Sequence, residues 1–253
     1  MRFNYPLLLV TLGALLLNAE AASSCSCVRA ITNFVVPYKR LTQSNKDSAV
    51  FVGKALSYER IYIRLDEGGE TPRRIYRFAV EETFGNLKTK QVEIETGDGC
   101  CDCGYLFDVG ERYFVFAHRS ETTNRLTSSV CDGTVPITHA IDYVEIFRAA
   151  SRRKPESRIF GRVIDFNDPN VNGARGITVV AEGEEERLKT VTDRLGQYRF
   201  VGIRPSKYKV RVIPPTGRRS SPVDLDKVSD HVEIVIEPQS YSELDFWLET
   251  VKP

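Results

Sequence analysis

Six cysteines are the side chains whose type and grouping best suit chemistry in this sequence. They all lie within the first 131 residues: Cys25, Cys27, Cys100, Cys101, Cys103 and Cys131. Thiolates bind zinc in reducing compartments, whereas in an exported chain clustered cysteines indicate a disulfide framework. No histidine lies close to the cluster in the sequence, so we predict disulfide bonds and no metal site.

The N-terminus indicates an exported chain. Residues 1–21 combine an early positive charge, an apolar run over residues 6–17 and small residues before a cleavage point, which is typical of a secretory signal peptide. The run is shorter than the roughly 20 residues that cross a bilayer. We therefore predict a secreted, periplasmic or cell-envelope protein without a transmembrane segment. Cleavage after Ala21 and cleavage after Ser24 both fit, and a lipid anchor on Cys25 is a minor alternative.

Catalytic patterns are missing from the sequence. The histidines His118, His139 and His231 are far apart, and the common hydrolase, zinc-protease and phosphate-loop signatures are absent. The 35 basic and 34 acidic side chains nearly cancel, which argues against a nucleic-acid partner. We predict a binding protein that is not an enzyme and needs no cofactor.

An Asp- and Asn-rich stretch at residues 165–173 has two interpretations. Its oxygen-bearing side chains are calcium ligands, but Asp, Asn, Pro and Gly are also the ordinary residues of surface turns. The stretch departs from the EF-hand pattern, so we favour the turn.

Two β-rich units must position these residues. Residues 151–157 are polar, charged and interrupted by proline, which predicts a linker between a unit at residues 22–150 and one at residues 158–250. The first unit has five predicted strands, the number in an OB-type barrel, with flanking helices at residues 38–45 and after Pro136. The strands are residues 49–64, 73–84, 91–96, 112–119 and 125–130.

The second unit shows the period-two alternation of half-buried strands. Seven strands at regular intervals predict an immunoglobulin-like β-sandwich, so the fold class is mainly β. The strands are residues 158–166, 177–182, 189–192, 197–201, 207–214, 231–237 and 243–248. Because all cysteines precede the linker, we expect the two units to fold independently.

Several motifs of the first unit occur in a recognisable order. Cys25-Ser26-Cys27-Val28 is followed by residues 49–54, 103–105, 110–116 and 126–131. Together they resemble the netrin-like domain of the tissue inhibitors of metalloproteinases and their bacterial relatives, over residues 25–150. The resemblance implies two disulfide bonds, Cys25–Cys103 and Cys27–Cys131.

The resemblance leaves Cys100 and Cys101 without assigned partners. They are either bonded to each other, free or intermolecular, and Cys101 is an alternative to Cys103 in the first bridge. A bond between neighbours is strained because their Cα atoms lie about 3.8 Å apart, less than disulfides prefer.

The same resemblance implies how an N-terminal segment would inhibit a metalloproteinase. The free amine and carbonyl of Cys25 would chelate the catalytic zinc, Ser26 would enter a specificity pocket, and Val28 would line the contact ridge. Chelation requires that Cys25 be the first residue of the mature chain. Arg29 stands where the family has proline, and the third bridge of the animal inhibitors has no counterpart.

The second unit also has a family resemblance. Gly161-Arg162-Val163, the stretches at residues 192–203 and Tyr208-x-Val210-x-Val212 are similar to the carboxypeptidase-regulatory, transthyretin-like β-sandwich family. These are packing motifs and carry no reaction. The sequence thus predicts an extracellular protein partner, with a metalloproteinase as one candidate. The alternative is a cell-envelope or extracellular-matrix module in which the sandwich is a spacer or binding unit.

Overall fold

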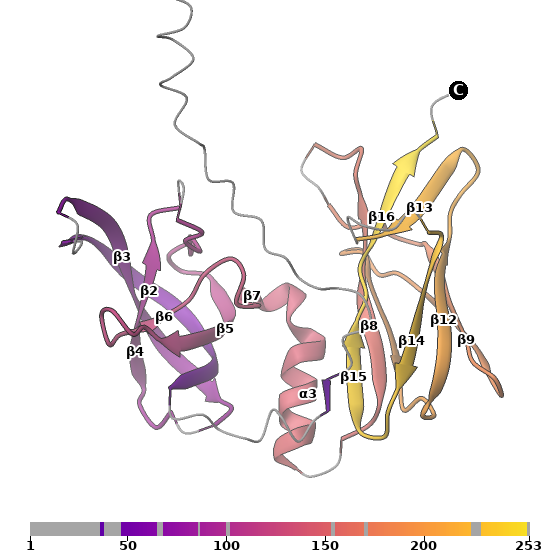
Figure 1. The fold of residues 1–253 in the computed structure, drawn as a ribbon, viewed down its shortest axis with the longest axis horizontal. Helices are drawn as coiled ribbons and strands as arrows, with labels where there is room; N and C mark the ends of the chain where they lie inside the picture. Colours follow the sequence, from indigo (N-terminus) through magenta and orange to yellow (C-terminus); the bar gives the residue numbers. More distant parts are fainter. Residues whose placement is uncertain are drawn as a thin grey trace, which may run out of the picture.

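The structure is a computed structural model that describes residues 36–37, 47–64, 68–85, 87–99, 102–152, 155–169, 172–223 and 229–251. The predicted signal peptide, the predicted helix at residues 38–45 and the segment from Cys25 to Val28 lie outside these residues, as do Cys100 and Cys101. The described part is mainly β, as predicted, with one α-helix between a barrel and a sandwich (Figure 1).

The first unit is a closed barrel of five strands. Their order is β2-β3-β4-β6-β5, and antiparallel pairing of β2 with β5 closes the ring, while β4 and β6 form its parallel pair. The predicted five-stranded barrel is confirmed. The strands are β2 (Ser48–Arg64), β3 (Glu70–Thr83), β4 (Gln91–Gly97), β5 (Arg112–Arg119) and β6 (Leu126–Thr127). A further short strand, β7 (Val135–Pro136), pairs antiparallel with β5 at Tyr113 and Phe114.

The apolar run at the start of β2 is buried on both faces. Phe51 points into the barrel, where its ring meets Phe78 edge-on with centroids 5.7 Å apart. Val50 and Val52 point outward and are buried in a second hydrophobic cluster built around the helix. A strand covered on both sides needs apolar residues at consecutive positions, which explains why β2 begins with a continuous apolar run.

The helix α3 (Ile141–Ser151) follows a short 3₁₀ turn, η1 (Ile137–His139), and confirms the helix predicted after Pro136. It packs on both units. Phe147 lies 5.5 Å from the ring of Phe84 in the barrel, whereas Tyr143 meets Phe160 of the sandwich edge-on at 5.5 Å. The helix therefore fills the space between barrel and sandwich.

The second unit is a sandwich of two sheets. One sheet has the order β10-β9-β12-β14, and the other contains β15, β8, β16 and β13, with β11 paired to β8 and β1 to β15. The strands are β1 (Val36–Pro37), β8 (Arg158–Asp165), β9 (Thr178–Glu182), β10 (Arg187–Val191), β11 (Gln197–Val201), β12 (Ser206–Ile213), β13 (Arg218–Pro222), β14 (His231–Ile236), β15 (Ser240–Glu243) and β16 (Phe246–Thr250).

The sandwich differs from the seven expected strands in three places. β1 comes from the range predicted for the first unit and pairs with β15. β13 is a polar strand at the edge of its sheet, so it shows no apolar alternation. The last predicted strand is divided into β15 and β16. Between them, the side chain of Asp245 accepts a hydrogen bond from the Arg162 backbone N–H at 2.7 Å, in place of a backbone carbonyl. Both strands pair parallel to β8.

A polar contact network accompanies the apolar packing around the helix. Arg158, only 4 % exposed, donates to Asp142 at 3.3 Å and to Glu145 at 3.0 Å. Arg199 lies 3.4 Å from Asp142, and the Tyr143 hydroxyl donates to Glu243 at 2.5 Å. The predicted linker thus joins two units that are in contact through α3.

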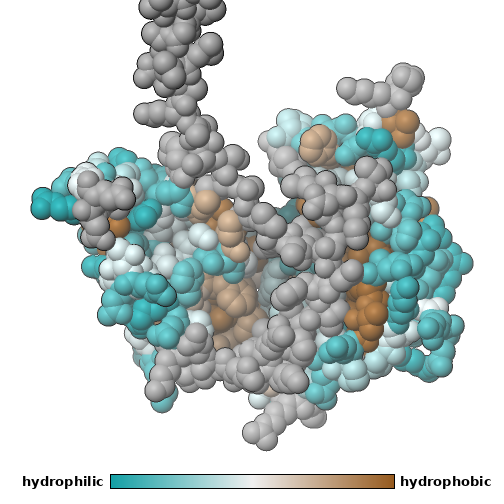
Figure 2. Space-filling view, in the orientation of Figure 1, coloured by the Kyte–Doolittle hydropathy of each residue, from teal (hydrophilic) through white to brown (hydrophobic). Residues whose placement is uncertain are grey.

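Hydrophilic residues dominate the end of the barrel farthest from the sandwich and much of the visible sandwich face (Figure 2). In the part of the chain that the structure describes, no helix combines the length and the apolar character needed to cross a membrane.

Candidate functional site

Two of the predicted disulfide cysteines lie on neighbouring loops at one end of the barrel. Cys103 follows β4, Cys131 follows β6, and the Val130 N–H donates to the Cys103 carbonyl at 3.0 Å. Both cysteines are disulfide-bonded. Their predicted partners, Cys25 and Cys27, lie outside the described residues, so the pairing stays a prediction.

We call the described residues 98–99, 102–105 and 128–134 the cysteine loops. The carboxylate of Asp102 organises the first of them from within. It accepts the backbone N–H groups of Asp98 at 2.8 Å, Gly99 at 3.1 Å and Gly104 at 3.2 Å. The strand residue Gly97 is required beside it, because a side chain there would collide with Asp102.

The charge of Asp102 is matched by the neighbouring strand. Arg73 of β3 donates to it at 2.8 Å. Burial alone would raise the pKa of Asp102, but the three N–H donors and Arg73 together lower it below its ordinary value. The carboxylate therefore stays ionised at neutral pH and holds the loop against β3.

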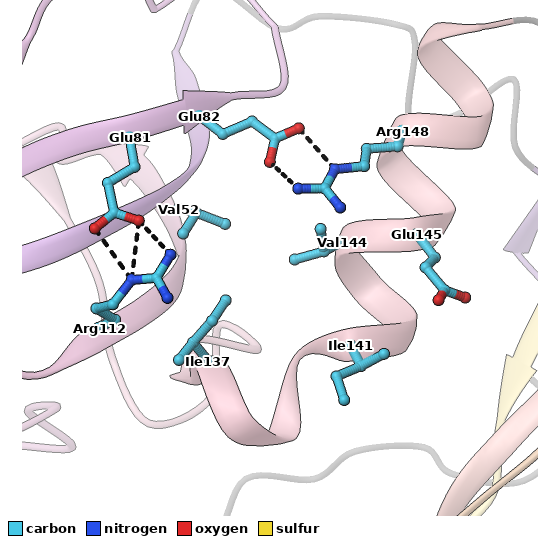
Figure 3. A pocket seen from close by; sticks show the side chains of 9 residues that line it. All are labelled: Val52, Glu81, Glu82, Arg112, Ile137, Ile141, Val144, Glu145 and Arg148. Atoms are coloured by element: carbon cyan, nitrogen blue, oxygen red, sulfur yellow. Dashed lines mark hydrogen bonds and ion pairs between the residues drawn. The ribbon is translucent and has the colours of Figure 1, made fainter.

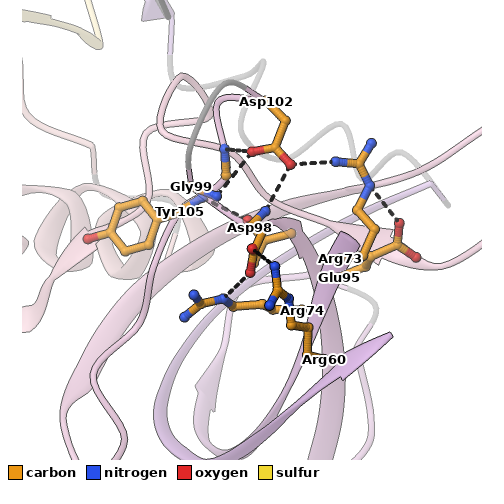
Figure 4. A network of polar contacts seen from close by, with 10 residues as sticks. Arg60, Arg73, Arg74, Glu95, Asp98, Gly99, Asp102 and Tyr105 are labelled. Atoms are coloured by element: carbon orange, nitrogen blue, oxygen red, sulfur yellow. Dashed lines mark hydrogen bonds and ion pairs between the residues drawn. The ribbon is translucent and has the colours of Figure 1, made fainter. Parts of the chain in front are cut away.

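A second acidic residue fixes the loop to a hairpin that extends beyond the barrel. Asp98 accepts from Arg60 at 2.5 Å and from Arg74 at 2.8 Å (Figure 4). The hydrogen bond from Arg74 is the main cause that lowers the pKa of Asp98, and Arg60 adds to it. Two strands of the hairpin thus converge on one loop carboxylate.

We call residues 57–64 and 70–76 the hairpin arm. β5 pairs only with residues 48–54 of β2, so the arm part of β2 pairs with β3 alone. On one face of the arm, the guanidinium of Arg74 lies 5.2 Å from the Tyr58 ring centre and that of Arg60 lies 5.6 Å from Tyr62. Tyr58 also packs on the buried Tyr76, with ring centroids 5.1 Å apart.

The arm and its anchoring acids are functional candidates that the sequence interpretation missed. Tyr58, Arg60 and Tyr62 occupy every second position, so in a strand their side chains share one face. This spacing indicates a strand with an aromatic and basic face. Their connection to Asp98 depends on how the barrel closes, and no local pattern indicates it.

A cavity of about 370 Å³ separates the barrel from one side of α3 (Figure 3). Its apolar part includes Val52, Ile137 and Val144. Two ion pairs line the rest: Arg112 donates to Glu81 at 2.9 Å, and Arg148 donates to Glu82 at 2.8 Å. The third carboxylate of the lining, Glu145, accepts from Arg158 at 3.0 Å. Because all three carboxylates are already paired with guanidinium groups, we interpret this cavity as part of the helix packing and not as a reaction site.

The Asp- and Asn-rich stretch forms a turn in its described part. The Asp165 carboxylate accepts the Asn167 N–H at 3.0 Å and pairs with Arg218 at 2.5 Å. Within the described ranges, no three His, Cys, Asp or Glu side chains are grouped closely enough to hold a metal ion.

No family model matches this chain, and no curated protein matches it. The netrin-like and carboxypeptidase-regulatory-like resemblances therefore have no independent support.

Solved structures with some similarity include two pilins and a third bacterial protein. GBS52, the minor pilin of Streptococcus agalactiae, is 9% identical over 83% of this chain and 86% of its own, with a TM-score of 0.31. The Bacillus anthracis TIE protein is 11% identical over 96% of this chain and 44% of its own, with a TM-score of 0.30. A streptococcal ancillary pilin is 7% identical over 87% and 69%, with a TM-score of 0.30. Similarities this low identify neither a family nor a function.

Proposed function

We propose that this protein is a non-enzymatic interaction module of the cell envelope or extracellular matrix. Its binding surface is the hairpin arm together with the cysteine loops, and it recognises a protein partner. The sandwich, packed against the barrel through α3, is the spacer or a second binding unit. The observation that carries the proposal is an exposed Tyr and Arg surface that is already ordered by Asp98.

The composition and order of the arm support binding. Tyr58 and Tyr62 are 49% and 59% exposed, which is high for large aromatic side chains. Tyrosine and arginine are the residue types that contribute most at protein interfaces. Because the two arginines are held by Asp98 and lie over the tyrosine rings, little side-chain freedom remains to be lost when a partner binds.

The electrostatics of this end do not favour acid–base catalysis. Asp98 and Asp102 have lowered pKa values because arginines and backbone N–H groups stabilise their charged forms. A general base works best with a pKa near the operating pH. These two carboxylates are therefore suited to holding loops in place.

A crosslinking experiment tests the proposal. We expect a photo-crosslinking side chain at position 62 to capture a partner from the extracellular or envelope fraction of the source organism, and the same side chain at position 166 to capture nothing. Phe166 is a matched control because it is also an aromatic residue, 62% exposed, on the sandwich. Loss of the captured band in a Y58A variant would support the arm, whereas equal capture from both positions would contradict it.

Metalloproteinase inhibition is a second candidate, and one observation favours it. Cys103 and Cys131 are both disulfide-bonded and lie on adjoining loops beside the arm. If their partners are Cys25 and Cys27, the N-terminal segment is fixed at the proposed binding surface. Inhibition then requires that the exported chain start at Cys25 with a free amine, because an amide nitrogen has no lone pair to offer to zinc.

N-terminal sequencing and an inhibition assay separate the two candidates. A mature chain that starts at Ala22 argues against inhibition and leaves the envelope or matrix proposal. If the chain starts at Cys25, we expect it to inhibit a metalloproteinase, and one extra residue before Cys25 should abolish that inhibition without changing the fold.

A further inference from the structure

A second, smaller cavity of about 230 Å³ opens at the end of the barrel that carries the cysteine loops. It lies between the end of β4 and the loop that connects β5 to β6. Six of its lining residues are serine or threonine, and Ile63 is the one large apolar side chain among them. Such a lining is suited to a polar ligand with several hydrogen-bonding groups.

Two buried acceptors in this lining lack hydrogen-bond partners. Glu95 is 4% exposed, yet its Oε2 atom receives no hydrogen bond from the part of the chain that the structure describes, and the same is true of Oγ1 of Thr123. Buried polar atoms are nearly always satisfied, and leaving one unpaired costs free energy. Unpaired atoms from two different elements at one cavity point to a ligand that supplies donors to both.

The charges around Glu95 indicate that this ligand is neutral. Arg73 and Arg125 lie 3.9 and 4.0 Å from its carboxylate oxygens, too far for hydrogen bonds but close enough to repel a cation. An anion would instead face Glu95 and the nearby Asp102 carboxylate, which is occupied by Arg73 and three backbone N–H groups. Two carboxylates and two guanidinium groups leave no net charge to balance.

We propose that this cavity binds one sugar unit of a neutral glycan, with neighbouring hydroxyls of the sugar donating to the carboxylate of Glu95 and one hydroxyl paired with Thr123. The volume is below the roughly 300–1,000 Å³ of sites for drug-sized ligands, and it exceeds several times the roughly 30 Å³ of a water molecule. One monosaccharide fits that range. Ile63 and Arg73 of the hairpin arm line the cavity, but the proposal goes beyond the protein-binding function above because the two side chains that contact the sugar, Glu95 and Thr123, lie outside the arm.

Binding of simple glycosides tests the inference. Saturation-transfer NMR with the methyl glycosides of glucose, galactose, mannose and N-acetylglucosamine, at millimolar concentration, should detect binding of at least one of them to the full mature protein. Hydrogen bonds to a charged group are strong, so E95Q should weaken that binding at least about tenfold. T123V, which removes only the second contact, should weaken it by a smaller factor.

The matched control is E93Q. Glu93 lies two residues before Glu95 on β4, but it is exposed and pairs with Arg77 and Arg125 at the surface. E93Q should bind the glycoside as the wild type does. Unchanged two-dimensional NMR spectra away from the cavity show that each variant is folded.

Three outcomes would overturn the inference. They are no binding of any of the four glycosides, equal binding by wild type and by both cavity variants, and Glu95-dependent binding of methylguanidinium in place of the glycosides. Loss of the crosslink at position 62 with retained glycoside binding would count against the protein-binding proposal alone.

Discussion

The two ends of the barrel are held by different kinds of interaction. The end next to the sandwich is covered by α3, where Phe114, fully buried, stacks on Tyr143 with ring centroids 5.6 Å apart. The end with the cysteine loops is held by the disulfide bonds of Cys103 and Cys131 and by carboxylates paired with arginines of the hairpin arm. Both sets join segments that are distant in the sequence, but only the first does so with extensive apolar burial.

These two kinds of interaction differ in what they contribute to the stability of the fold and to the geometry of the binding surface. Burial of apolar area is the dominant favourable contribution to folding, whereas partly exposed ion pairs contribute little net stability. We therefore expect the helix-covered end to determine how stable the molecule is. The cysteine-loop end fixes the geometry of a surface, and changes there should affect binding more than unfolding.

The largest expected effect on the free energy of unfolding is that of F114A. This side chain contacts the rings of Phe84, Phe147 and Tyr143, and its removal leaves a cavity. We expect the free energy of unfolding, measured with urea, to fall by about 3–5 kcal/mol. The control F166A changes an exposed ring and should cost less than about 1 kcal/mol; similar losses for both variants would contradict the assignment of the core.

R158A comes next, because it removes one partner from a buried ion pair. Asp142 would keep Arg199, but the ion pairs that link α3 to β8 would be lost, and the ring contact of Tyr143 with Phe160 would remain. We expect a loss of about 3 kcal/mol and, in calorimetry, separate unfolding transitions for barrel and sandwich. A single transition at an unchanged temperature would show that this pair does not couple the two units.

A comparison of two fragments measures what the helix contributes to the sandwich. The sequence predicts that residues 156–253 fold alone, whereas the structure places Phe160 of this unit, 4% exposed, against α3. We expect residues 137–253 to be more stable than residues 156–253 by about 2 kcal/mol, because the longer fragment keeps that ring covered. Equal stability in urea, under reducing conditions, would make α3 part of the barrel alone.

The sequence predicts the strands of both units well where the burial pattern is local. The bounds of β5 and β11 coincide with the predicted ranges, because each has buried positions flanked by polar turns. β13 was missed because its edge position removes the need for an apolar face. The sequence does not predict that α3 is buried on two sides. Ile137, Ile141 and Val144 recur at helical spacing, and this pattern indicates only one apolar stripe.

The candidate site was less predictable than the fold for a physical reason. Asp102 stands between cysteines, which directed attention to sulfur chemistry, and its partner Arg73 is 29 residues away. Which arginine meets which carboxylate depends on the register of β3 against β4 and on the path of the cysteine loop. Charge composition alone carries no information on that register.

D102N should have a smaller effect on stability than the changes around α3. The amide would accept N–H bonds less strongly than the carboxylate and would lose the charge attraction to Arg73. We expect a loss of about 1–2 kcal/mol at pH 7, together with faster hydrogen exchange at Gly99 and Gly104. Unchanged exchange at these two amides would contradict the role assigned to Asp102.

The smallest effects should come from the titration of Asp102 and Asp142, because these two carboxylates respond to acidification with opposite signs. The pKa of Asp102 is lowered in the folded state, so its stabilisation is present above the unfolded value of 3.8 and is lost as the pH falls through the lowered pKa. Burial raises the pKa of Asp142 despite Arg199 and Arg158. The charged form of Asp142 therefore costs stability above its raised pKa, and that cost disappears as the pH falls through it towards 3.8.

Urea unfolding of wild type, D102N and D142N between pH 3 and pH 7 resolves the two contributions. The deficit of D102N relative to wild type should be constant near neutral pH and should shrink as the pH falls below 3.8 through the lowered pKa of Asp102. The free-energy difference between D142N and wild type should shift in favour of wild type as the pH is lowered towards 3.8, because protonation gives Asp142 the neutral state that asparagine already has. The same pH dependence for both variants would mean that the two ends of the barrel do not differ electrostatically.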